Sequence, residues 1–554
     1  MGRSARTFSV VAVVVLFGLG LAPPPVRGAG VVAADHRLAS EAGAEILARG
    51  GNSVDAAVAT ALASGVVQPS GSGLGGGGFA VVRNEKYPRG FVLDFREVAP
   101  AAATQDMFLD AEGGVQKGAS TKSGRAVAVP SEGVGLWALL EKFGNLPASE
   151  VVAPAVRLAS GGFEVGPHLS RSLTSSKDIE VTSWFFASGA TIKEGQQFRN
   201  PALAKTLTQW AKTRGTYLNR GEGAKAVLRR VEAAGGILTA EDLADVRPVE
   251  REPVVVEYRG YTLITMPPPS SGGVALAQML RVLEGYDLAA LGHNSSDYLH
   301  LLIESMKHAY ADRAHHLGDP DFVEVPVKPL LSDERRDAIR HAIWPGRTFD
   351  TAAYGKLVGP PKDAGTLHIS VLDSGGTAVA LTTTINTSFG SGLMVPELGF
   401  PLNNQMDDFS AAPGVPNAYG LVGDAANAIA PKKRPLSSMS PTVVLGPDGR
   451  VVMVIGASGG SQIISSVLQV TLNVIDFGMD PEEAVSAPRI HHQWLPDEVW
   501  VEPGIPLDVQ RNLEARGHKL RLEETFSSVQ LVVQSQEMEG AADPRKGGTA
   551  AGVR

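Results

Sequence analysis

The 554-residue sequence has no cysteine, which excludes both disulfide bonds and a lipid anchor on cysteine. It also has no excess of basic residues, because 50 Lys and Arg stand against 58 Asp and Glu and the formal net charge is −8. That balance excludes the positively charged footprint of a nucleic-acid-binding protein. With 44% apolar and 19% charged residues, the chain is typical of a globular protein whose stability comes from its core.

Long hydrophobic runs are also missing, with one short exception near the N-terminus. Two arginines precede the apolar run FSVVAVVVLFGLGLA, which is too short for a comfortable membrane span. The following PPPVRGAG offers Val26 and Gly28 as the small residues of a cleavage site. The pattern predicts a secretory signal peptide over residues 1–28, cut between Gly28 and Gly30. The mature protein is therefore expected to be periplasmic or secreted and to lack a membrane anchor, with a buried core segment as the alternative interpretation.

Predicted helices and strands alternate in blocks rather than in a βαβ rhythm. Residues 35–70 indicate two helices separated by Gly50 and Gly51, with Asn52 or Ser53 as the N-cap of the second. Further predicted elements are strands at 79–82 and 91–100, mostly helix over 130–235, strand structure at 253–273, helices at 274–286 and 295–319, a loop at 344–365 and a strand–turn–helix unit at 451–475. This order favours stacked antiparallel sheets covered by helices, and no tandem repeat is present.

Two short motifs are weak signals. Residues Gly73 to Gly78 match GxGxxG, but a predicted helix precedes them and a strand follows, which inverts the order of a dinucleotide-binding loop. A turn that lets backbones pack closely is the better interpretation. His308, Asp312 and His316 lie four residues apart on one predicted helix face, a spacing that can bind a metal. A polar helix face with aromatic neighbours explains them more simply.

The stretch GASGG at Gly456 is a stronger rival signal. It matches GxSxG between a predicted strand and a predicted helix, as a nucleophile elbow requires. Asp497 and His518 follow Ser458 in the order Ser, Asp, His. From the local pattern alone, an α/β-hydrolase with Ser458 as nucleophile is therefore the best alternative.

The stretch TLHISVLDSGGTAVALTTTI, which begins at Thr366, predicts a hairpin that follows a loop rich in Pro and Gly. Its apolar rows are buried together only if the opposite pairs are Val371–Val379, Ile369–Leu381 and Leu367–Thr383. This register predicts a turn over Ser374 to Gly376 and places Thr384 opposite Thr366, with side chains roughly 5 Å apart on the polar face. The pair can be a simple cross-strand hydrogen bond. The alternative is a nucleophile at a future chain end.

A hydroxyl is a poor nucleophile unless a base takes its proton. If Thr366 becomes the N-terminal residue, its own α-amine supplies that base. The amine exists only after the chain is cut before Thr366, and the opposite hydroxyl of Thr384 would orient the nucleophile. Thr366 would then act both in self-cleavage and in catalysis.

The sequence resembles bacterial γ-glutamyltransferases (γ-glutamyltranspeptidases), which are N-terminal-nucleophile hydrolases. The resemblance covers nearly everything after the signal peptide and rests on LASEAGAEILARGGNSVDAAVATALA, SGLGGGGF, LDFREVAP, PPPSSGG, AYADRAHHLGDPDF, NTSFGSG, LNNQMDDFS and RPLSSMSPT. It implies an α+β fold, a four-layer αββα sandwich of stacked antiparallel sheets. It also implies a precursor cut into a large subunit, residues 29–365, and a small subunit, residues 366–554, intertwined in one globular domain.

The resemblance implies a role for each matching site residue. These are Thr366 as nucleophile with Thr384 assisting, Gly459 and Gly460 as oxyanion donors, Arg96, Ser437 and Ser438 for the α-carboxylate of a γ-glutamyl group, Asn386, Gln405 and Asp408 for its α-amino group, and Tyr419 in a lid. The chemistry of these residues is consistent with the implied roles. A zwitterionic amino-acid group needs a guanidinium for its carboxylate and an acidic residue for its ammonium. Glycines have no Cβ atom, so their backbone N–H groups can approach an oxyanion closely. Ser458 then becomes a turn residue.

The implied enzyme attacks γ-glutamyl amides such as glutathione and passes the acyl group to water, an amino acid or a peptide. No metal or organic cofactor and no nucleic acid is implied. A β-lactam (cephalosporin or glutaryl) acylase on the same fold is the first alternative, and a non-catalytic periplasmic binding protein the second. One departure is Leu367, which stands where the family usually has a second hydroxyl residue. Leu367 is expected on the apolar row, where it affects packing and leaves the efficiency of processing open.

Overall fold

The computed structural model describes residues 26–187, 190–355, 365–412, 415, 417–419, 421–524 and 526–553. Most of the predicted signal peptide and residues 356–364 of the predicted loop lie outside the described residues. Val26 to Gly28, the end of the predicted signal peptide, form a short edge strand. No helix among the described residues is both long and apolar enough to cross a bilayer.

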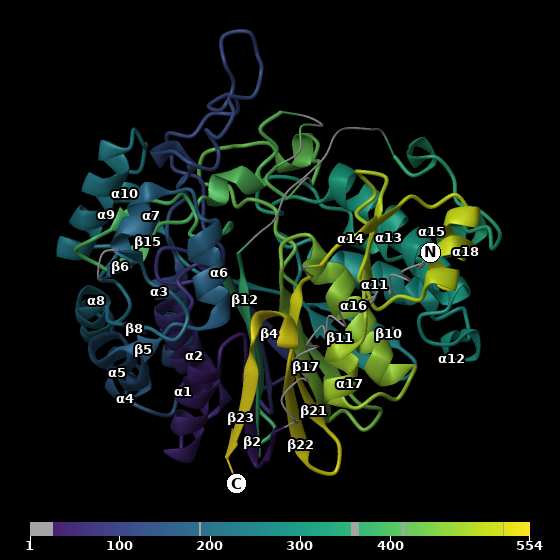
Figure 1. Ribbon diagram of the computed structural model, residues 1–554, viewed down its shortest axis with the longest axis horizontal. Helices are drawn as coiled ribbons and strands as arrows, with labels where there is room; N and C mark the ends of the chain where they lie inside the picture. The colour runs from purple at the N-terminus through teal and green to yellow at the C-terminus, as the bar shows by residue number, and fades with distance from the viewer. Residues whose placement is uncertain are drawn as a thin grey trace, which may run out of the picture.

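Two seven-stranded antiparallel sheets lie face to face in the centre of the molecule (Figure 1). The sheet that we call the β12 sheet has the order β23 (Thr549–Val553), β2 (Gly30–Ala34), β12 (Leu367–Asp373), β13 (Ala378–Thr384), β3 (Gly77–Asn84), β4 (Tyr87–Phe95) and β9 (Val249–Arg251). The β17 sheet has the order β1 (Val26–Gly28), β22 (Met538–Ala542), β21 (Ser528–Gln534), β17 (Val451–Ser458), β16 (Thr442–Leu445), β11 (Tyr261–Thr265) and β10 (Val254–Tyr258). Both sheets combine strands from before and after residue 366, so neither half of the chain builds a sheet alone.

Helices cover the outer face of each sheet, on the left and right of Figure 1. The β12 sheet is covered by α1 (Arg37–Ala48), α2 (Ser53–Val67), α3 (Glu132–Phe143), α5 (Ala153–Gly161), α8 (Pro201–Lys212) and α9 (Gly221–Ala233). The β17 sheet is covered by α11 (Gly272–Leu283), α13 (Ser296–His316), α15 (Asp333–Ala342), α16 (Gln462–Ile475) and α17 (Pro481–Ser486). The predicted four-layer αββα sandwich of antiparallel sheets is confirmed.

Shorter elements connect these layers. They are α4 (Ala148–Val151), α6 (Pro167–Ser175), α7 (Ile179–Trp184), α10 (Ala240–Asp245), α12 (Leu288–Leu291), α14 (Val327–Leu330), α18 (Leu507–Ala515), β5 (Phe163–Glu164), β6 (Phe186–Ala187), β7 (Ala190–Thr191), β8 (Gln197–Phe198), β14 (Met394–Val395), β15 (Phe400–Pro401), β18 (Ile490–His491), β19 (Val499–Val501), β20 (Leu520–Leu522), and the 3₁₀ turns η1 (Gly124–Ala126), η2 (Thr351–Ala353), η3 (Gln405–Asp408), η4 (Ala425–Asn427) and η5 (Pro544–Lys546).

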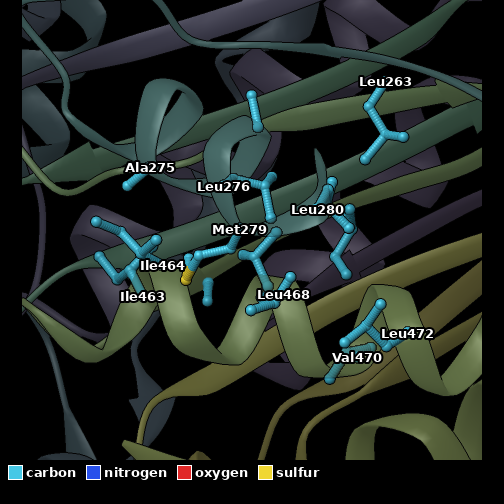
Figure 2. Packing of buried hydrophobic residues seen from close by; sticks show 14 of the residues in the cluster. Leu263, Ala275, Leu276, Met279, Leu280, Ile463, Ile464, Leu468, Val470 and Leu472 are labelled. Atoms are coloured by element: carbon cyan, nitrogen blue, oxygen red, sulfur yellow. The ribbon is translucent and has the colours of Figure 1, made fainter. Parts of the chain in front are cut away.

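Local sequence signals explain several elements. Asn52 caps α2, because its side chain accepts hydrogen bonds from the backbone N–H groups of Val54 and Asp55, and Asp55 completes a capping box. On the other side, apolar side chains of α11 and α16 pack against each other above the β17 sheet, with Met279 beside Ile464 in Figure 2. The buried faces of these helices hold the sheets in place.

The predicted β12–β13 hairpin has the predicted register. Leu367 pairs with Thr383, Ile369 with Leu381 and Val371 with Val379. The turn covers Ser374 to Gly376, and Gly376 has a φ of 75°, which glycine adopts without strain. The apolar row packs in the core that the β12 sheet shares with its helices.

The polar row of the hairpin is also buried, because it faces the β17 sheet. The imidazole of His368 has both nitrogens within hydrogen-bonding distance of hydroxyl oxygens, Oγ1 of Thr382 at 2.7 Å and Oγ of Ser370 at 3.1 Å. The hydroxyl of Ser370 donates to the carbonyl of Gln530 in β21 at 3.0 Å. Complete burial lowers the pKa of His368 to about 3, so the imidazole between the sheets is neutral.

Glycines allow close backbone contacts where the GxGxxG match occurs. A Cβ atom on Gly76 would lie 2.0 Å from the carbonyl oxygen of Thr384, and one on Gly78 would lie 2.3 Å from that of Thr382. The segment follows α2 and leads into β3, as the sequence predicts. These glycines therefore serve backbone packing.

Candidate active site

Thr366 lies directly before β12 and is 3% exposed. Its hydroxyl oxygen lies 2.8 Å from the carbonyl oxygen of Gly365 and 3.1 Å from the hydroxyl oxygen of Thr384. Thr384 also donates a hydrogen bond to the Gly365 carbonyl, at 2.9 Å. Gly365 is itself fixed, because its N–H donates to the carbonyl of Asn386 at 2.9 Å. Two hydroxyls therefore converge on the carbonyl group that precedes Thr366.

A small pocket opens beside this pair. Its lining residues are Arg96, Thr366, Thr384, Asn386, Gln405, Asp408, Tyr419, Leu421, Leu436, Ser437, Ser438, Met439, Gly460 and Ile463. All the site residues expected from the sequence are present except Gly459, which lies next to the lining residue Gly460. The enclosed volume is about 20 Å³, which accommodates about one water molecule. The expected site residues thus lie together around a very small space.

Charge in the pocket comes from Arg96 and Asp408. Arg96 follows β4 and is 1% exposed, and its Nη2 donates to Oδ2 of Asp408 at 2.5 Å. Its Nε donates to the carbonyl oxygen of Pro435 at 3.2 Å. Burial raises the pKa of Asp408, while Arg96 and a hydrogen bond from the Gln405 amide oppose that increase. The pocket therefore holds a desolvated cation beside a desolvated acid.

Three polar atoms of the pocket are buried and have no hydrogen-bond partner among the described residues. They are Oδ1 of Asn386, Oε1 of Gln405 and Oγ of Ser438. Buried polar groups are normally paired, so three such atoms at one place are suited to bind a polar ligand. Two amide oxygens accept hydrogen bonds and a hydroxyl can donate one, which matches a ligand with both an ammonium and a carboxylate group.

Ser437 is positioned by residues that the sequence interpretation did not include. Its carbonyl oxygen accepts a hydrogen bond from the Ser271 hydroxyl at 2.6 Å and another from the Ser271 N–H at 2.8 Å. Nε of Arg313 in α13 donates to the same Ser271 hydroxyl at 3.0 Å. Both residues belong to motifs that carry the resemblance, PPPSSGG and AYADRAHH, although no role was predicted for them.

Tyr419, which the resemblance places in a lid, lines the pocket. The Tyr419 hydroxyl donates to the carbonyl of Asn386 at 2.7 Å. Asp407 holds the lid from the other side, since its carboxylate accepts hydrogen bonds from the Ala418 N–H at 2.7 Å and from the Ser120 hydroxyl at 2.6 Å. Burial raises the pKa of Asp407 to about 6. The sequence interpretation missed this residue, although it stands beside Asp408 in QMDDFS.

The GASGG stretch lies at the end of β17. Either the backbone conformation or close packing requires glycine at each of its three glycine positions. Gly459 and Gly460 have φ angles of 128° and 57°, which favour glycine. A Cβ on Gly456 would lie 2.2 Å from the His368 ring, so this glycine makes room for the imidazole between the sheets. The prediction that Ser458 is a turn residue is wrong. It is the fully buried last residue of β17, because the strand continues until the glycine pair begins the turn.

The serine triad of the rival hypothesis is not assembled. The Ser458 hydroxyl accepts a hydrogen bond from Nζ of Lys546 at 2.7 Å. His518 is occupied elsewhere, with its Nε2 lying 2.7 Å from Nδ1 of His300. Asp497 accepts a hydrogen bond from Lys519 at 2.8 Å. The order of residues in the sequence resembles a triad, but the fold separates them.

The described residues offer no convincing metal site. Asp312 forms an ion pair with Arg335 at 2.7 Å, which removes it from the predicted helix-face pattern of His308, Asp312 and His316. His300, Glu304 and His518 do have ligand atoms within 4.8 Å of one another. However, Nζ of Lys307 lies 3.5 Å from the Glu304 carboxylate and would repel a cation.

Comparisons with known proteins identify the family of the chain. The family model described as gamma-glutamyltranspeptidase matches residues 39–553. The glutathione hydrolase proenzyme of Escherichia coli (strain K12) is 44% identical over 532 residues, which cover 94% of this chain and 91% of that protein. Cephalosporin acylase from Bacillus halodurans has a similar structure, with a TM-score of 0.83, 30% identity, and coverage of 96% of this chain and 97% of that one. Helicobacter pylori gamma-glutamyltranspeptidase, at 39% identity, aligns with a TM-score of 0.56 over 58% of this chain and 93% of that one. A family match over nearly the whole chain, together with relatives named glutathione hydrolase, shows that this chain belongs to the γ-glutamyltranspeptidase family of enzymes.

Proposed function

We propose that the protein is a self-processing γ-glutamyltransferase and glutathione hydrolase. The observation that carries the proposal is the position of Thr366, whose hydroxyl lies against the Gly365 carbonyl and beside a pocket of unpartnered polar atoms. Its relatives include proteins named glutathione hydrolase proenzyme, which supports processing of a precursor.

Self-cleavage begins with the hydroxyl of Thr366. Its oxygen attacks the carbonyl carbon of Gly365, and the hydroxyl proton passes to the amide nitrogen as the C–N bond breaks. Thr384 stabilises the developing oxyanion, because its hydroxyl already donates to that carbonyl oxygen. Water then hydrolyses the resulting ester. The products are a large chain, residues 29–365 after removal of the signal peptide, and a small chain that begins with Thr366.

Catalysis uses the same hydroxyl and the new α-amine as its base. The γ-glutamyl α-carboxylate is bound by Arg96 with Ser437 and Ser438, and the α-ammonium by Asn386, Gln405 and Asp408. Thr366 attacks the γ-carbonyl carbon, and the backbone N–H groups of Gly459 and Gly460 bind the oxyanion. The amine of the donor leaves with the proton that the base removed. Water, an amino acid or a peptide then releases the γ-glutamyl group from the ester.

The fit of the pocket to a zwitterion is electrostatic. Arg96 and Asp408 form an ion pair in the pocket and are both almost fully buried. A γ-glutamyl head brings its own carboxylate and ammonium, so each protein charge gains a second partner without leaving the first. The unpartnered oxygens of Asn386 and Gln405 supply the remaining acceptors.

The experiment is intact-mass analysis and N-terminal sequencing of purified protein, followed by assay with a chromogenic γ-glutamyl anilide. Two chains, one beginning at Thr366, together with release of the chromophore are the expected result. A single uncut chain with activity would contradict the proposal. A single inactive chain would indicate the alternative of a non-catalytic binding protein.

A β-lactam acylase is the second candidate, because the structure resembles a cephalosporin acylase over 96% of the chain. A glutaryl side chain lacks the α-amino group, so it would leave the acceptors of Asn386 and Gln405 unpaired. The two candidates are separated by comparing glutaryl and γ-glutamyl anilides. We expect a strong preference for the γ-glutamyl compound, and a preference for the glutaryl compound would favour the acylase.

We also propose a periplasmic or secreted location, on the basis of the N-terminal signal sequence. Mass analysis of the mature large chain tests this, because its first residue is expected after Gly28. Cutting there would remove β1, which pairs with β22 in the uncut chain at the edge of the β17 sheet. An edge strand of three residues can be lost without opening the core.

A further inference from the structure

Lys546, near the C-terminus of the chain, contacts both Thr366 and the strand that leads to the glycine pair. It is the last residue of η5. Its Nζ donates to the backbone carbonyl oxygen of Thr366 at 3.2 Å and to the Ser458 hydroxyl at 2.7 Å. Ser458 is followed directly by Gly459. One ammonium group therefore bridges the residue that carries the nucleophile and the residue that precedes the proposed oxyanion donors.

Asp35 completes this bridge from the end of β2. Its carboxylate accepts hydrogen bonds from the His368 N–H at 3.1 Å and from the Gln530 amide at 2.9 Å. The Ser458 hydroxyl also donates to it, at 3.4 Å. Asp35 is 1% exposed, and the nearby charge of Lys546 partly opposes the rise in its pKa that burial causes. The β12 and β17 sheets are thus linked at the height of the nucleophile.

We propose that Lys546 is a positioning residue for Thr366, which fixes the nucleophile relative to the glycine pair and places a positive charge beside the α-amine that chain cleavage creates. The inference rests on the proposed function, since the amine exists only if the chain is cut before Thr366. It assigns to Lys546 a role that is separate from binding the γ-glutamyl head, because Lys546 does not line that pocket.

The charge matters because the α-amine acts as the base. An ordinary α-ammonium loses its proton near pH 8, so much of it would be protonated and inactive at neutral pH. Within one residue the carbonyl oxygen and the nitrogen are about 3 Å apart, and Nζ lies 3.2 Å from that oxygen. The ammonium therefore lies within about 6 Å of that nitrogen, a range in which a cation disfavours a second positive charge and favours the unprotonated amine.

Other charged or titratable groups lie around Thr366 and Lys546. They are Asp35 after β2, Arg96 after β4, Asp408 in η3, the neutral His368 in β12, and His36 and His168 in the pocket that Lys546 lines. Arg96 and Asp408 neutralise each other as an ion pair. Burial lowers the pKa of His36 to about 4 and that of His168 to about 3, so both are neutral at pH 7. Among the charged side chains of the described residues, only Lys546 has a hydrogen bond to Thr366 itself.

The first experiment compares pH profiles of kcat/KM for wild type, Lys546→Met and Lys546→Arg, all checked by mass for complete cleavage. The acid limb of this profile reports the base of the free enzyme. We expect the limb of Lys546→Met to move to higher pH by about 0.5 to 1 unit, and that of Lys546→Arg to stay near wild type. Lys142→Met is the matched control, because Lys142 lies on α3, where it pairs with Glu250 of β9, and its loss changes the net charge equally.

The second experiment restores the charge chemically. The chain has no cysteine, so Lys546→Cys introduces a single thiol. Lys546 lines an open pocket of about 680 Å³, which gives a thiol reagent access. An aminoethyl disulfide adduct carries a positive charge, whereas a methyl disulfide adduct does not. We expect the aminoethyl adduct to return the acid limb toward wild type and the methyl adduct to leave it displaced.

The outcomes separate this inference from the proposed function. If Lys546→Cys stays uncut, aminoethylation of the purified precursor is expected to start cleavage while methylation is not. If the acid limbs of kcat/KM lie at the same pH for wild type, Lys546→Met and both adducts, Lys546 does not have the proposed role. An uncut Lys546→Cys precursor that neither adduct causes to be cleaved would also overturn that role. A wild-type enzyme that is active as one uncut chain would instead overturn the proposed function.

Discussion

The hydroxyl oxygen of Thr366 lies 3.1 Å from the hydroxyl oxygen of Thr384, and both hydroxyls donate to the carbonyl oxygen of Gly365. The contact joins the first residue after a loop to the last residue of β13, which are 18 positions apart. The proposed nucleophile, a second hydroxyl and the carbonyl group of one peptide bond are therefore held together in the uncut chain. Two predictions concern this arrangement directly.

Thr366→Ala should remain a single uncut and inactive chain, because cleavage and catalysis both need the hydroxyl. Thr366→Ser should still be cut, since it keeps the hydroxyl and loses only a methyl group. A denaturing gel and an anilide assay measure both variants. An Ala variant that is cut at the same position would remove Thr366 from the mechanism.

Thr384→Ala should slow cleavage by roughly 10- to 100-fold, because it removes one hydrogen bond to a carbonyl oxygen that becomes negatively charged. Thr383→Ala is the matched control, since the Thr383 hydroxyl contacts Ser72 and not Gly365. The fraction of cut chain is followed over time after purification. If the two variants are cut at the same rate, Thr384 has only a structural role.

Ser458→Ala should keep activity within roughly tenfold of wild type, because losing a hydroxyl that contacts Lys546, Asp35 and the Ser528 carbonyl costs far less than losing a nucleophile. Lys546 keeps its second hydrogen bond, to Thr366, in this variant. The α/β-hydrolase hypothesis predicts nearly complete loss instead. Steady-state kinetics with the anilide distinguish these outcomes.

Arg96→Gln should leave self-cleavage largely intact but weaken the use of γ-glutamyl donors. Losing a charge-assisted contact to a desolvated carboxylate costs about 2–4 kcal/mol, or roughly 30- to 1000-fold in kcat/KM. Asp408→Asn should act similarly through the ammonium group. The measurement compares donors with and without the α-carboxylate, on wild type and on the Arg96 variant. If wild type does not discriminate, or the variant keeps the full preference, Arg96 is a structural residue and the substrate assignment fails.

Glu132→Gln should stabilise the protein at alkaline pH. Glu132 and Glu97 are fully buried near each other, and burial raises the pKa of each to about 8. Between about pH 4.5 and 8 the folded state holds a proton that the unfolded state has released, so the free energy of unfolding falls as pH rises. For Glu132 alone this loss is at most about 5 kcal/mol.

The test of that pH dependence is the melting temperature at pH 5 and pH 8.5. We expect Glu132→Gln to melt higher than wild type at pH 8.5 and to differ little at pH 5. Glu141→Gln is the control, because Glu141 lies in the same helix but is exposed. Parallel curves for all three proteins would show that Glu132 is ionised in the folded state or does not influence stability.

Local sequence patterns determined the elements of this fold. Alternating apolar residues fixed the β12–β13 register, because a slip of one residue would turn Ile369 and Leu381 away from the core. That register by itself placed Thr384 opposite Thr366. The pair Asn52 and Ser53 likewise marked the start of α2, and the structure shows that Asn52 is the cap and that Asp55 completes the capping box. Such signals act over a few residues or one turn, so one sequence is enough to detect them.

Contacts between distant segments were decided only by the tertiary structure. Nothing local to Ser458 indicates that Lys546, 88 residues away, binds its hydroxyl, or that strand β17 extends through it. The burial of His368 between two sheets depends on Gly456 in another strand, and neither residue predicts the other. The GxSxG spacing is a local pattern, but the separation of Ser458 from His518 results from the packing of whole layers. The sequence by itself therefore determined the hairpin that presents Thr366. The packing of the two sheets decided which groups surround Thr366, because those groups come from residues that are close only after the chain has folded.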